Sequence, residues 1–416
     1  MKKNIYNSKT SLNIDNLLPL AKNNETSIWV YDEKTILDKL KKLAMFDIIR
    51  FSQKSCSNIS ILKILKYNNV KIDAVSLGEI ERSLIAGFSP NNNNIVFTSD
   101  LLDIKTINRI VDLNIPVNIG SIDMINQLGK FSPKHKIWLR INPKFGDGYN
   151  IRTNTGGENS KHGIWNIFEA IEKMKKFDFD LIGLHMHIGS GAKYINLVKV
   201  CDEMLNNVIN IKKDIQYISC GGGLPIPYFP KEKNVNINNY FKLWNNTRKK
   251  IEKYLGHKIY LEIEPGRFIV AESGVLISQI RTIKKVNNRY FILVNAGFND
   301  LIRPSIYGSY HHISLMPIDN RKLTNEKISY VIGGPLCESG DIFTQDSSGK
   351  IQTRLLPKAK IGDYLVFHDT GAYGSSMSSN YNSKPLIPEF LITKKNEIKK
   401  IRRAQTIKEM ISLELL

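Results

Sequence analysis

The stretch from Met45 to Leu77 reads MFDIIRFSQKSCSNISILKILKYNNVKIDAVSL. It opens with an apolar run, passes through a polar segment that contains Lys54, and then shows helical spacing over Ile59–Tyr67 before a second apolar run. Apolar runs with little alternation are typical of strands that are buried on both faces. The stretch therefore predicts a strand–helix–strand unit, with Lys54 at the carboxyl end of its first strand.

The same alternation of apolar runs and helical segments continues along the chain. Eight runs are expected to form strands: Ile48–Lys54, Asp73–Leu77, Ile95–Ser99, Pro116–Gly120, Lys136–Ile141, Leu181–Ile188, Ile215–Cys220 and Lys258–Glu264. One of the helices between them is expected to begin after Asp100, a suitable N-cap, with Leu101 in its apolar stripe. This pattern predicts an α/β (β/α)₈ barrel of TIM type, and a doubly wound open sheet is the alternative.

The pattern of apolar and polar residues changes after about residue 272. Short apolar runs such as Val275–Ile283 and Tyr364–His368 are separated by polar or glycine-containing turns, which is typical of an antiparallel β domain. Three parts are therefore expected. They are an N-terminal segment that packs with the β domain (residues 1–44), a cofactor-binding barrel (45–271), and a mainly antiparallel β domain that supplies substrate and dimer contacts (272–416).

Composition limits the classes of function. The formal charge of +20 would suit nucleic acid or an acidic membrane, but the lysines are scattered and form no basic face with aromatic residues, so neither partner is expected. No apolar segment is of signal-peptide type or long enough to span a bilayer. The four cysteines lie far apart without paired metal spacing, so we expect a cytoplasmic protein that binds no metal.

Polar residues follow several of the predicted strands, where the chemistry of a parallel barrel gathers. The amine of Lys54 could form a Schiff base with an aldehyde. The alternative, more common for a single lysine, is a solvated side chain without a role. Glu264 could accept a hydrogen bond from a protonated ring nitrogen, and Arg267 could clamp a phosphate or a carboxylate. A local ion pair at a turn is the alternative for these two residues.

Two further turns suit a flat, phosphorylated ligand. Gly221, Gly222 and Gly223 leave backbone N–H groups bare, so that an anion can approach them closely. His187 could stack on an aromatic ring and Ser190 could donate to a phosphate. His185 lies on the same side of its strand as His187, but no third metal ligand has suitable spacing, and a core histidine is the plain reading of His185. Together these groups are what pyridoxal phosphate needs.

Seven segments resemble a known family, the fold-type III pyridoxal phosphate-dependent decarboxylases, and most closely the bacterial diaminopimelate decarboxylases. They are Asp73–Glu79 (DAVSLGE), His187–Gly191 (HIGSG), Gly221–Gly223, Glu264–Arg267 (EPGR), Arg303–Tyr310 (RPSIYGSY), Cys337–Asp341 (CESGD) and Gly371–Tyr373 (GAY). The chain departs from many members in having Ser55-Cys56 after the lysine. The resemblance implies an alanine-racemase-like pairing of barrel and β domain, and a homodimer with shared active sites.

The resemblance also implies roles for individual residues. The cofactor would be held by Lys54, Asp73, His187, Ser190, Gly222, Gly223, Glu264, Pro265, Gly266, Arg267 and Tyr373. Substrate would be contacted by Arg267, Arg303, Tyr307, Glu338 and Tyr373. The catalytic residues would be Lys54, His187 and Cys337, with Cys337 delivering a proton from the partner subunit.

The implied reaction is decarboxylation of meso-2,6-diaminopimelate to L-lysine and CO₂. This substrate carries an amino-acid group at each end, so its non-reacting end needs a cation and an anion, which Arg303 and Glu338 supply. A site for ornithine would need the acid but not the extra arginine. A decarboxylase of another basic amino acid, ornithine- or arginine-like, is the alternative. Glu264 argues against a racemase, since alanine-racemase relatives have an arginine there.

Overall fold

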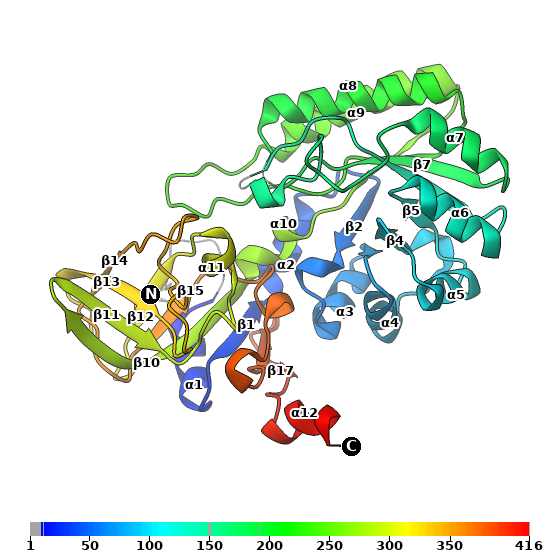
Figure 1. Ribbon diagram of the computed structural model, residues 1–416. Helices are drawn as coiled ribbons and strands as arrows, with labels where there is room; N and C mark the ends of the chain where they lie inside the picture. The colour runs from blue at the N-terminus through cyan, green and yellow to red at the C-terminus, as the bar shows by residue number, and fades with distance from the viewer. Residues whose placement is uncertain (1–9, 11, 149–150, 191, 416) are drawn as a thin grey trace. The chain divides into compact units, whose positions relative to one another are not determined.

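The computed structural model describes residues 10, 12–148, 151–190 and 192–415. The chain divides into two compact units (Figure 1). One unit contains residues 40–226 and 234–268, and the other contains the described parts of residues 1–39, 227–233 and 269–416. The segment 227–233, which follows the last glycine turn of the first unit, thus groups with the second unit.

The first unit is a closed barrel of eight parallel strands in the order β2-β3-β4-β5-β6-β7-β8-β9. The strands are β2 (Ile48–Ser52), β3 (Lys71–Ala74), β4 (Ile95–Ser99), β5 (Val117–Ile119), β6 (Lys136–Ile141), β7 (Asp180–Met186), β8 (Tyr217–Ser219) and β9 (Tyr260–Ile263). β2 pairs with β9 as well as with β3, so the sheet closes on itself. The expected barrel is confirmed, and the open sheet is excluded.

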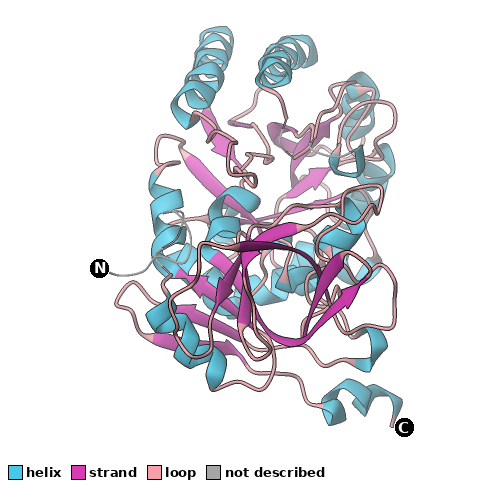
Figure 2. Ribbon diagram, turned by 90° about the vertical axis from the view of Figure 1, so that its left-hand side faces the viewer, coloured by secondary structure: helices cyan, strands magenta, loops and turns pink. Residues whose placement is uncertain are grey.

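Helices cover the outside of the barrel (Figures 1 and 2). They are α3 (Ile59–Tyr67), α4 (Leu77–Ile85), α5 (Ile104–Asp112), α6 (Ile122–Phe131), α7 (Ile167–Lys175), α8 (Tyr194–Ile211) and α9 (Ile237–Leu255). Each buries one apolar stripe, as Ile61, Leu62 and Leu65 of α3 illustrate. The short helix α10 (Arg267–Val270) follows β9 directly.

Two local expectations were wrong, and capping explains both. The second strand ends at Ala74, because Ser76 caps α4 by accepting from the Glu79 backbone N–H. The cap of α5 is Asp103, which accepts from Thr106 N at 2.9 Å, rather than Asp100. Leu101 therefore lies before the helix and is 68% exposed.

The second unit is built on a nine-stranded sheet with the path β14-β13-β11-β10-β1-β16-β17, while β15 pairs with β10 and β12. Its strands are β1 (Ile28–Asp32), β10 (Gly274–Val286), β11 (Arg289–Val294), β12 (Ile313–Met316), β13 (Lys327–Gly333), β14 (Arg354–Pro357), β15 (Tyr364–Phe367), β16 (Glu389–Ile392) and β17 (Ile398–Arg402). Most pairs are antiparallel, but β1–β16 and β11–β13 are parallel. The mainly antiparallel second sheet is therefore confirmed.

The N-terminal strand β1 lies inside this sheet, between β10 and β16. Val30 of β1 packs in one core with Val275, Val366 and Phe390. The α-helices of the described part of this unit are α1 (Ile14–Lys22), most of α2 (Glu33–Lys41), the end of α10, α11 (Arg303–Tyr307) and α12 (Ile407–Ile411). Of the helices in the described ranges, none combines the length and the apolar character that crossing a bilayer requires.

An ion pair between Arg50 of β2 and Glu262 of β9 lies within the barrel. Arg50 Nε is 2.5 Å from Glu262 Oε1 and Nη2 is 2.9 Å from Oε2, a two-pronged contact. Arg50 Nη1 also donates to the backbone oxygens of Ile72 and Asn93 at 3.1 and 3.0 Å. Both side chains are only 1% exposed, so neither charge has water as an alternative partner.

Removing one charge of this pair should be costly. In Glu262→Gln the Arg50 guanidinium stays buried without a counter-charge, and the free energy of unfolding should fall by about 3–5 kcal/mol. Urea denaturation measures it. The control is Glu172→Gln, which removes the exposed partner of Lys175 and should cost less than about 1 kcal/mol. Equal losses in the two variants would contradict the role given to the barrel pair.

Candidate active site

Several of the predicted site residues gather at one end of the barrel. Lys54 lies in the turn Gln53–Ser55 directly after β2, and Asp73 lies near the end of β3. His187 follows β7 and Glu264 follows β9. Since the strands are parallel, all four stand at the carboxyl end, and Lys54 and Glu264 follow strands that pair with each other.

The segment that carries Lys54 is fastened to the segment that carries Glu264. Ser52 Oγ donates to the backbone oxygen of Glu264 at 3.0 Å, and Ser55 Oγ donates to the backbone oxygen of Ser52 at 2.9 Å. A Cβ at Gly266 would lie 2.8 Å from Ser55 Oγ, so only glycine allows this approach. The Lys54 side chain itself is exposed at the strand ends.

Glu264 is a buried carboxylate that is bonded through both oxygens. His185 Nε2 donates to Oε2 at 2.9 Å and Ser219 Oγ donates to Oε1 at 2.7 Å. Burial alone would raise the pKa of Glu264, but the charge of His185 and these hydrogen bonds outweigh it and bring the pKa to about 2. Glu264 is therefore ionised at neutral pH.

Asp73 is a second buried carboxyl near Glu264, and its pKa shifts in the opposite direction. Burial and the charge of Glu264 raise the pKa of Asp73, against a hydrogen bond from Thr98 and the charge of Lys54. Its Oδ1 has no hydrogen-bond partner among the described residues. Two neighbouring acids with opposed pKa shifts are typical of a site that sorts protons between different groups.

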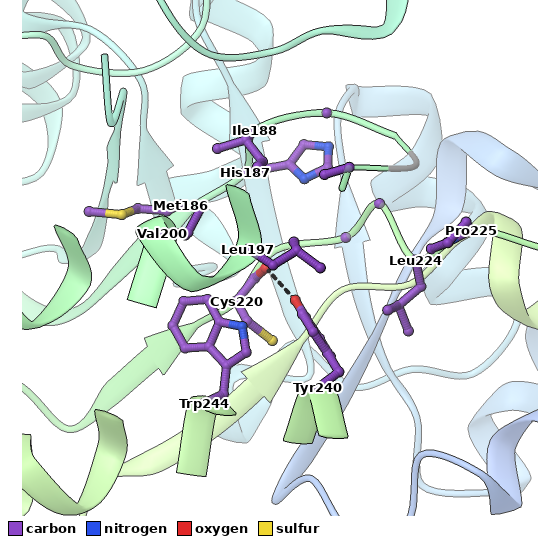
Figure 3. Close-up of a pocket in the computed structure, with 14 residues that line it drawn as sticks. Met186, His187, Ile188, Leu197, Val200, Cys220, Leu224, Pro225, Tyr240 and Trp244 are labelled. Atoms are coloured by element: carbon purple, nitrogen blue, oxygen red, sulfur yellow. Dashed lines mark hydrogen bonds between the residues drawn. The ribbon is translucent and has the colours of Figure 1, made fainter. Parts of the chain in front are cut away.

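His187 presents its ring beside the glycine turn (Figure 3). Its backbone oxygen accepts from Thr155 Oγ1 at 3.0 Å, which fixes the chain there. Burial and the charges of Arg140, Lys54 and His185 lower the pKa of His187 well below its usual range. A neutral, partly buried imidazole of this kind is suited to packing against a flat ring rather than to carrying charge.

The glycine turn after β8 forms a cradle. A Cβ at Gly223 (φ +90°) would lie 2.1 Å from the Gly189 oxygen, and a Cβ at Gly222 would lie 2.4 Å from the Glu264 oxygen. Within the described ranges, the backbone N–H groups of Gly222 and Gly223 donate to no protein acceptor. Such N–H groups suit the oxygens of a phosphate.

A small pocket opens beside this turn. Its walls include His187, Gly222 and Gly223, and its floor includes Tyr240 and Trp244 of α9 (Figure 3). The Tyr240 hydroxyl donates to the Cys220 oxygen at 3.4 Å, so the floor is tied to the strand end before the turn. The pocket is lined mainly by apolar groups.

The residues present fit pyridoxal phosphate. An ionised carboxylate, a neutral imidazole, a lysine and a bare glycine turn stand together at one end of one barrel. Ser190 lies in the bend after His187, and Arg267 is the first residue of α10, while Gly191 is outside the described residues. Among the described side chains, no group of three or more His, Cys, Asp or Glu could hold a metal ion.

The remaining predicted residues belong to the second unit. Arg303 and Tyr307 lie on α11, and Arg303 is only 5% exposed, which excludes a plain surface arginine. Its Nη1 donates to His311 Nε2 at 2.9 Å, and its guanidinium lies 5.0 Å from the centre of the Tyr228 ring. The Arg303 charge is thus held in place within its own unit.

Cys337 and Glu338 lie on an exposed loop. Cys337 N donates to Asn382 Oδ1 at 2.9 Å. Ser305 Oγ of α11 donates to the Gly340 oxygen at 2.9 Å, so the loop is anchored to the helix that carries Arg303 and Tyr307. Tyr373 lies elsewhere in this unit, in a turn where its φ is +57°.

Three side chains at the barrel end were not anticipated as functional. Ser52 and Ser219 bond Glu264, and His185, for which the sequence alone favours a core role, does so as well. Serines at strand ends give no distinctive sequence signal. His185 did give one, since it stands two residues before His187 in the same predicted strand.

Comparisons with known proteins agree with this geometry. Residues 32–271 match the family "Pyridoxal-dependent decarboxylase, pyridoxal binding domain". Diaminopimelate decarboxylase of Buchnera aphidicola subsp. Schizaphis graminum is 57% identical over 408 residues, which is 98% of each chain.

Solved structures give the same result. One structure of diaminopimelate decarboxylase is 52% identical, with a TM-score of 0.96 over 100% of this chain and 99% of that one. Another, from Helicobacter pylori and complexed with L-lysine, is 30% identical, with a TM-score of 0.84 over 96% and 99% of the two chains. The chain belongs to the diaminopimelate decarboxylase family of pyridoxal-dependent decarboxylases.

Proposed function

We propose that the chain decarboxylates meso-2,6-diaminopimelate to L-lysine and CO₂ with pyridoxal phosphate as cofactor, the last step of lysine biosynthesis. The observation that carries this proposal is the pair formed by Lys54 and Glu264, an amine and an ionised acid after adjacent barrel strands. Full-length similarity to diaminopimelate decarboxylases supports the choice of substrate.

When bound, pyridoxal phosphate supplies an electron-withdrawing ring that stabilises negative charge on the substrate's α-carbon as CO₂ leaves. In this proposal the Lys54 amine tethers the cofactor aldehyde. Glu264 would accept a hydrogen bond from the protonated ring nitrogen, and His187 would pack against the ring. Asp73 is also proposed to hold the cofactor, and its pKa is raised by burial and by the charge of Glu264.

The cofactor phosphate would be held at the glycine turn. Backbone N–H groups of Gly222 and Gly223 bind its oxygens without steric hindrance, and the Arg267 guanidinium supplies the opposing charge. The other residues proposed to hold the cofactor are Ser190 and Tyr373, which would help with the phosphate, and Pro265 and Gly266.

Substrate selection is assigned to the second unit. Arg303 binds the distal carboxylate of diaminopimelate and Glu338 binds its distal ammonium, while Tyr307 and Tyr373 line the site. The buried position of Arg303 and its hydrogen bond to His311 support a preset cation for this purpose. A decarboxylase for ornithine or arginine, the alternative, would have no use for a buried cation at the distal end.

Cys337 is proposed to return a proton from its Sγ to the α-carbon after CO₂ has left. We further propose a homodimer in which Cys337 and Glu338 serve the partner's barrel. Their exposure on a loop that is tied to α11 is compatible with this role. An exposed free thiol also suits a reducing, cytoplasmic location.

Lys54→Ala should remove both the visible absorbance of the purified protein and nearly all turnover, because no other amine of the site would hold the aldehyde. Absorption spectra and CO₂ release measure the two effects. The control is Lys63→Ala on the exposed face of α3, which should behave like the wild type. Substantial turnover by Lys54→Ala would refute the proposed role of Lys54.

Glu338→Ala should lower kcat/KM for diaminopimelate by about tenfold or more, since a charge-assisted hydrogen bond to the distal ammonium is lost. Assays on diaminopimelate, ornithine, arginine and lysine would show how the selectivity changes. Ser339→Ala on the same exposed loop is the matched control and should leave kcat/KM unchanged. An unaltered kcat/KM in Glu338→Ala would contradict the assignment.

Mixing two inactive variants tests the shared site. If Cys337 serves the partner's barrel, a hybrid dimer of Lys54→Ala and Cys337→Ala chains contains one intact site. Random reassociation of equal amounts should therefore restore about a quarter of wild-type activity. A mixture that stays inactive at every ratio, although the subunits exchange, would rule out the shared site.

A further inference from the structure

Glu264 is held from inside the barrel by two strands. Its partners His185 and Ser219 lie on β7 and β8 and are 2% and 0% exposed. Ser219 Oγ also accepts from the Gly221 backbone N–H at 3.1 Å, while Glu264 N donates to the Gly221 oxygen at 2.9 Å. The carboxylate thus shares one hydrogen-bond network with the first glycine of the phosphate turn.

His185 sits there at an energetic cost. Its Nδ1 is buried and has no hydrogen-bond partner among the described residues. A buried polar nitrogen without a partner is energetically unfavourable. His135, a buried histidine of the barrel directly before β6, bonds through both nitrogens, to Ser132 Oγ at 3.1 Å and to the Ile115 oxygen at 2.8 Å. Core packing alone does not account for a histidine that leaves one nitrogen unpaired.

The charged groups around Glu264 give a second reason to assign His185 a role beyond packing. Asp73 of β3 is a competing acid, and its pKa is raised by burial and by the charge of Glu264. Arg50, Arg140 and Lys54 are the nearby cations, but Arg50 is already committed to Glu262. His185 is the basic group in direct contact with Glu264, so it is placed to decide which of the two acids stays ionised.

We propose that His185 is a positioning residue that keeps Glu264 ionised and aimed, and thereby sets how strongly the site prefers a protonated pyridine nitrogen. Ser219 assists by fixing the other oxygen. This inference rests on the proposed function, because it assumes that Glu264 faces the ring nitrogen of pyridoxal phosphate. It adds His185 to the proposed site as a residue that acts on the cofactor through the protonation of Glu264.

The chemistry of the network explains the effect. Held by the Nε2–H of His185, the Glu264 carboxylate keeps its charge and offers its free lone pairs to a ring N–H. Without His185, burial favours the neutral acid, and the proton that belongs on the ring nitrogen stays on Glu264. The loss of His185 should therefore weaken the preference of the site for an aldehyde that carries the ring nitrogen. This preference is a property of binding and does not depend on turnover.

The test measures equilibrium binding of two aldehydes to the cofactor-free protein. One is pyridoxal phosphate, and the other is its analogue with C–H in place of the ring nitrogen. The ratio of their Kd values reports the contribution of the ring nitrogen. In His185→Leu the preference for pyridoxal phosphate should fall about tenfold or more. His185→Gln, whose amide nitrogen takes the place of Nε2, should restore most of it.

His135→Leu is the matched control, since it removes a buried histidine of the same unit without touching Glu264, and its ratio should equal that of the wild type. If His185→Leu does not fold, His185→Asn replaces it, because its amide corresponds to Nδ1 and not to Nε2. A wild-type ratio in the Leu or Asn variant overturns the inference, as does a Gln variant that behaves like them. Absence of any preference in the wild type overturns the proposed function itself.

Discussion

The pairing of the first and last barrel strands is the constraint on which the site depends. Parallel registration of β2 with β9, Ile49 opposite Ile263, closes the sheet and brings the two ends of a segment of more than 200 residues together. The buried fork between Arg50 and Glu262 secures this seam within the barrel. Directly above it, at the strand ends, stand the amine at 54 and the acid at 264.

Above that seam, buried polar groups stand at the end of the barrel, and their pKa values shift in different directions. Glu264 is kept ionised by His185, while its neighbour Asp73 is pushed toward the neutral form. His187 is kept neutral by burial and by the surrounding cations. The site therefore presents the ionised Glu264 and the neutral ring of His187, which suit a protonated pyridine.

The sequence predicted the barrel because eight short apolar runs alternate with helical segments, but this periodicity left a doubly wound open sheet as the alternative. The pairing of β2 with β9 in the structure excludes the open sheet. The sequence misjudged β3, since the run Asp73–Leu77 contains the cap of the next helix, and a cap at Ser76 competes with strand extension. It also missed the role of His185. The residues that bond Glu264 lie 79 and 45 positions away in the chain, and periodicity carries no information about such contacts.

A crystal structure of the protein with pyridoxal phosphate would show whether one pyridine ring lies between Lys54 and Glu264. Continuous density should run from Lys54 Nζ into the ring, and the ring nitrogen should lie within hydrogen-bond distance of a Glu264 oxygen. Density attached to another lysine, or a ring nitrogen that faces away from Glu264, would refute the proposed roles of Lys54 and Glu264.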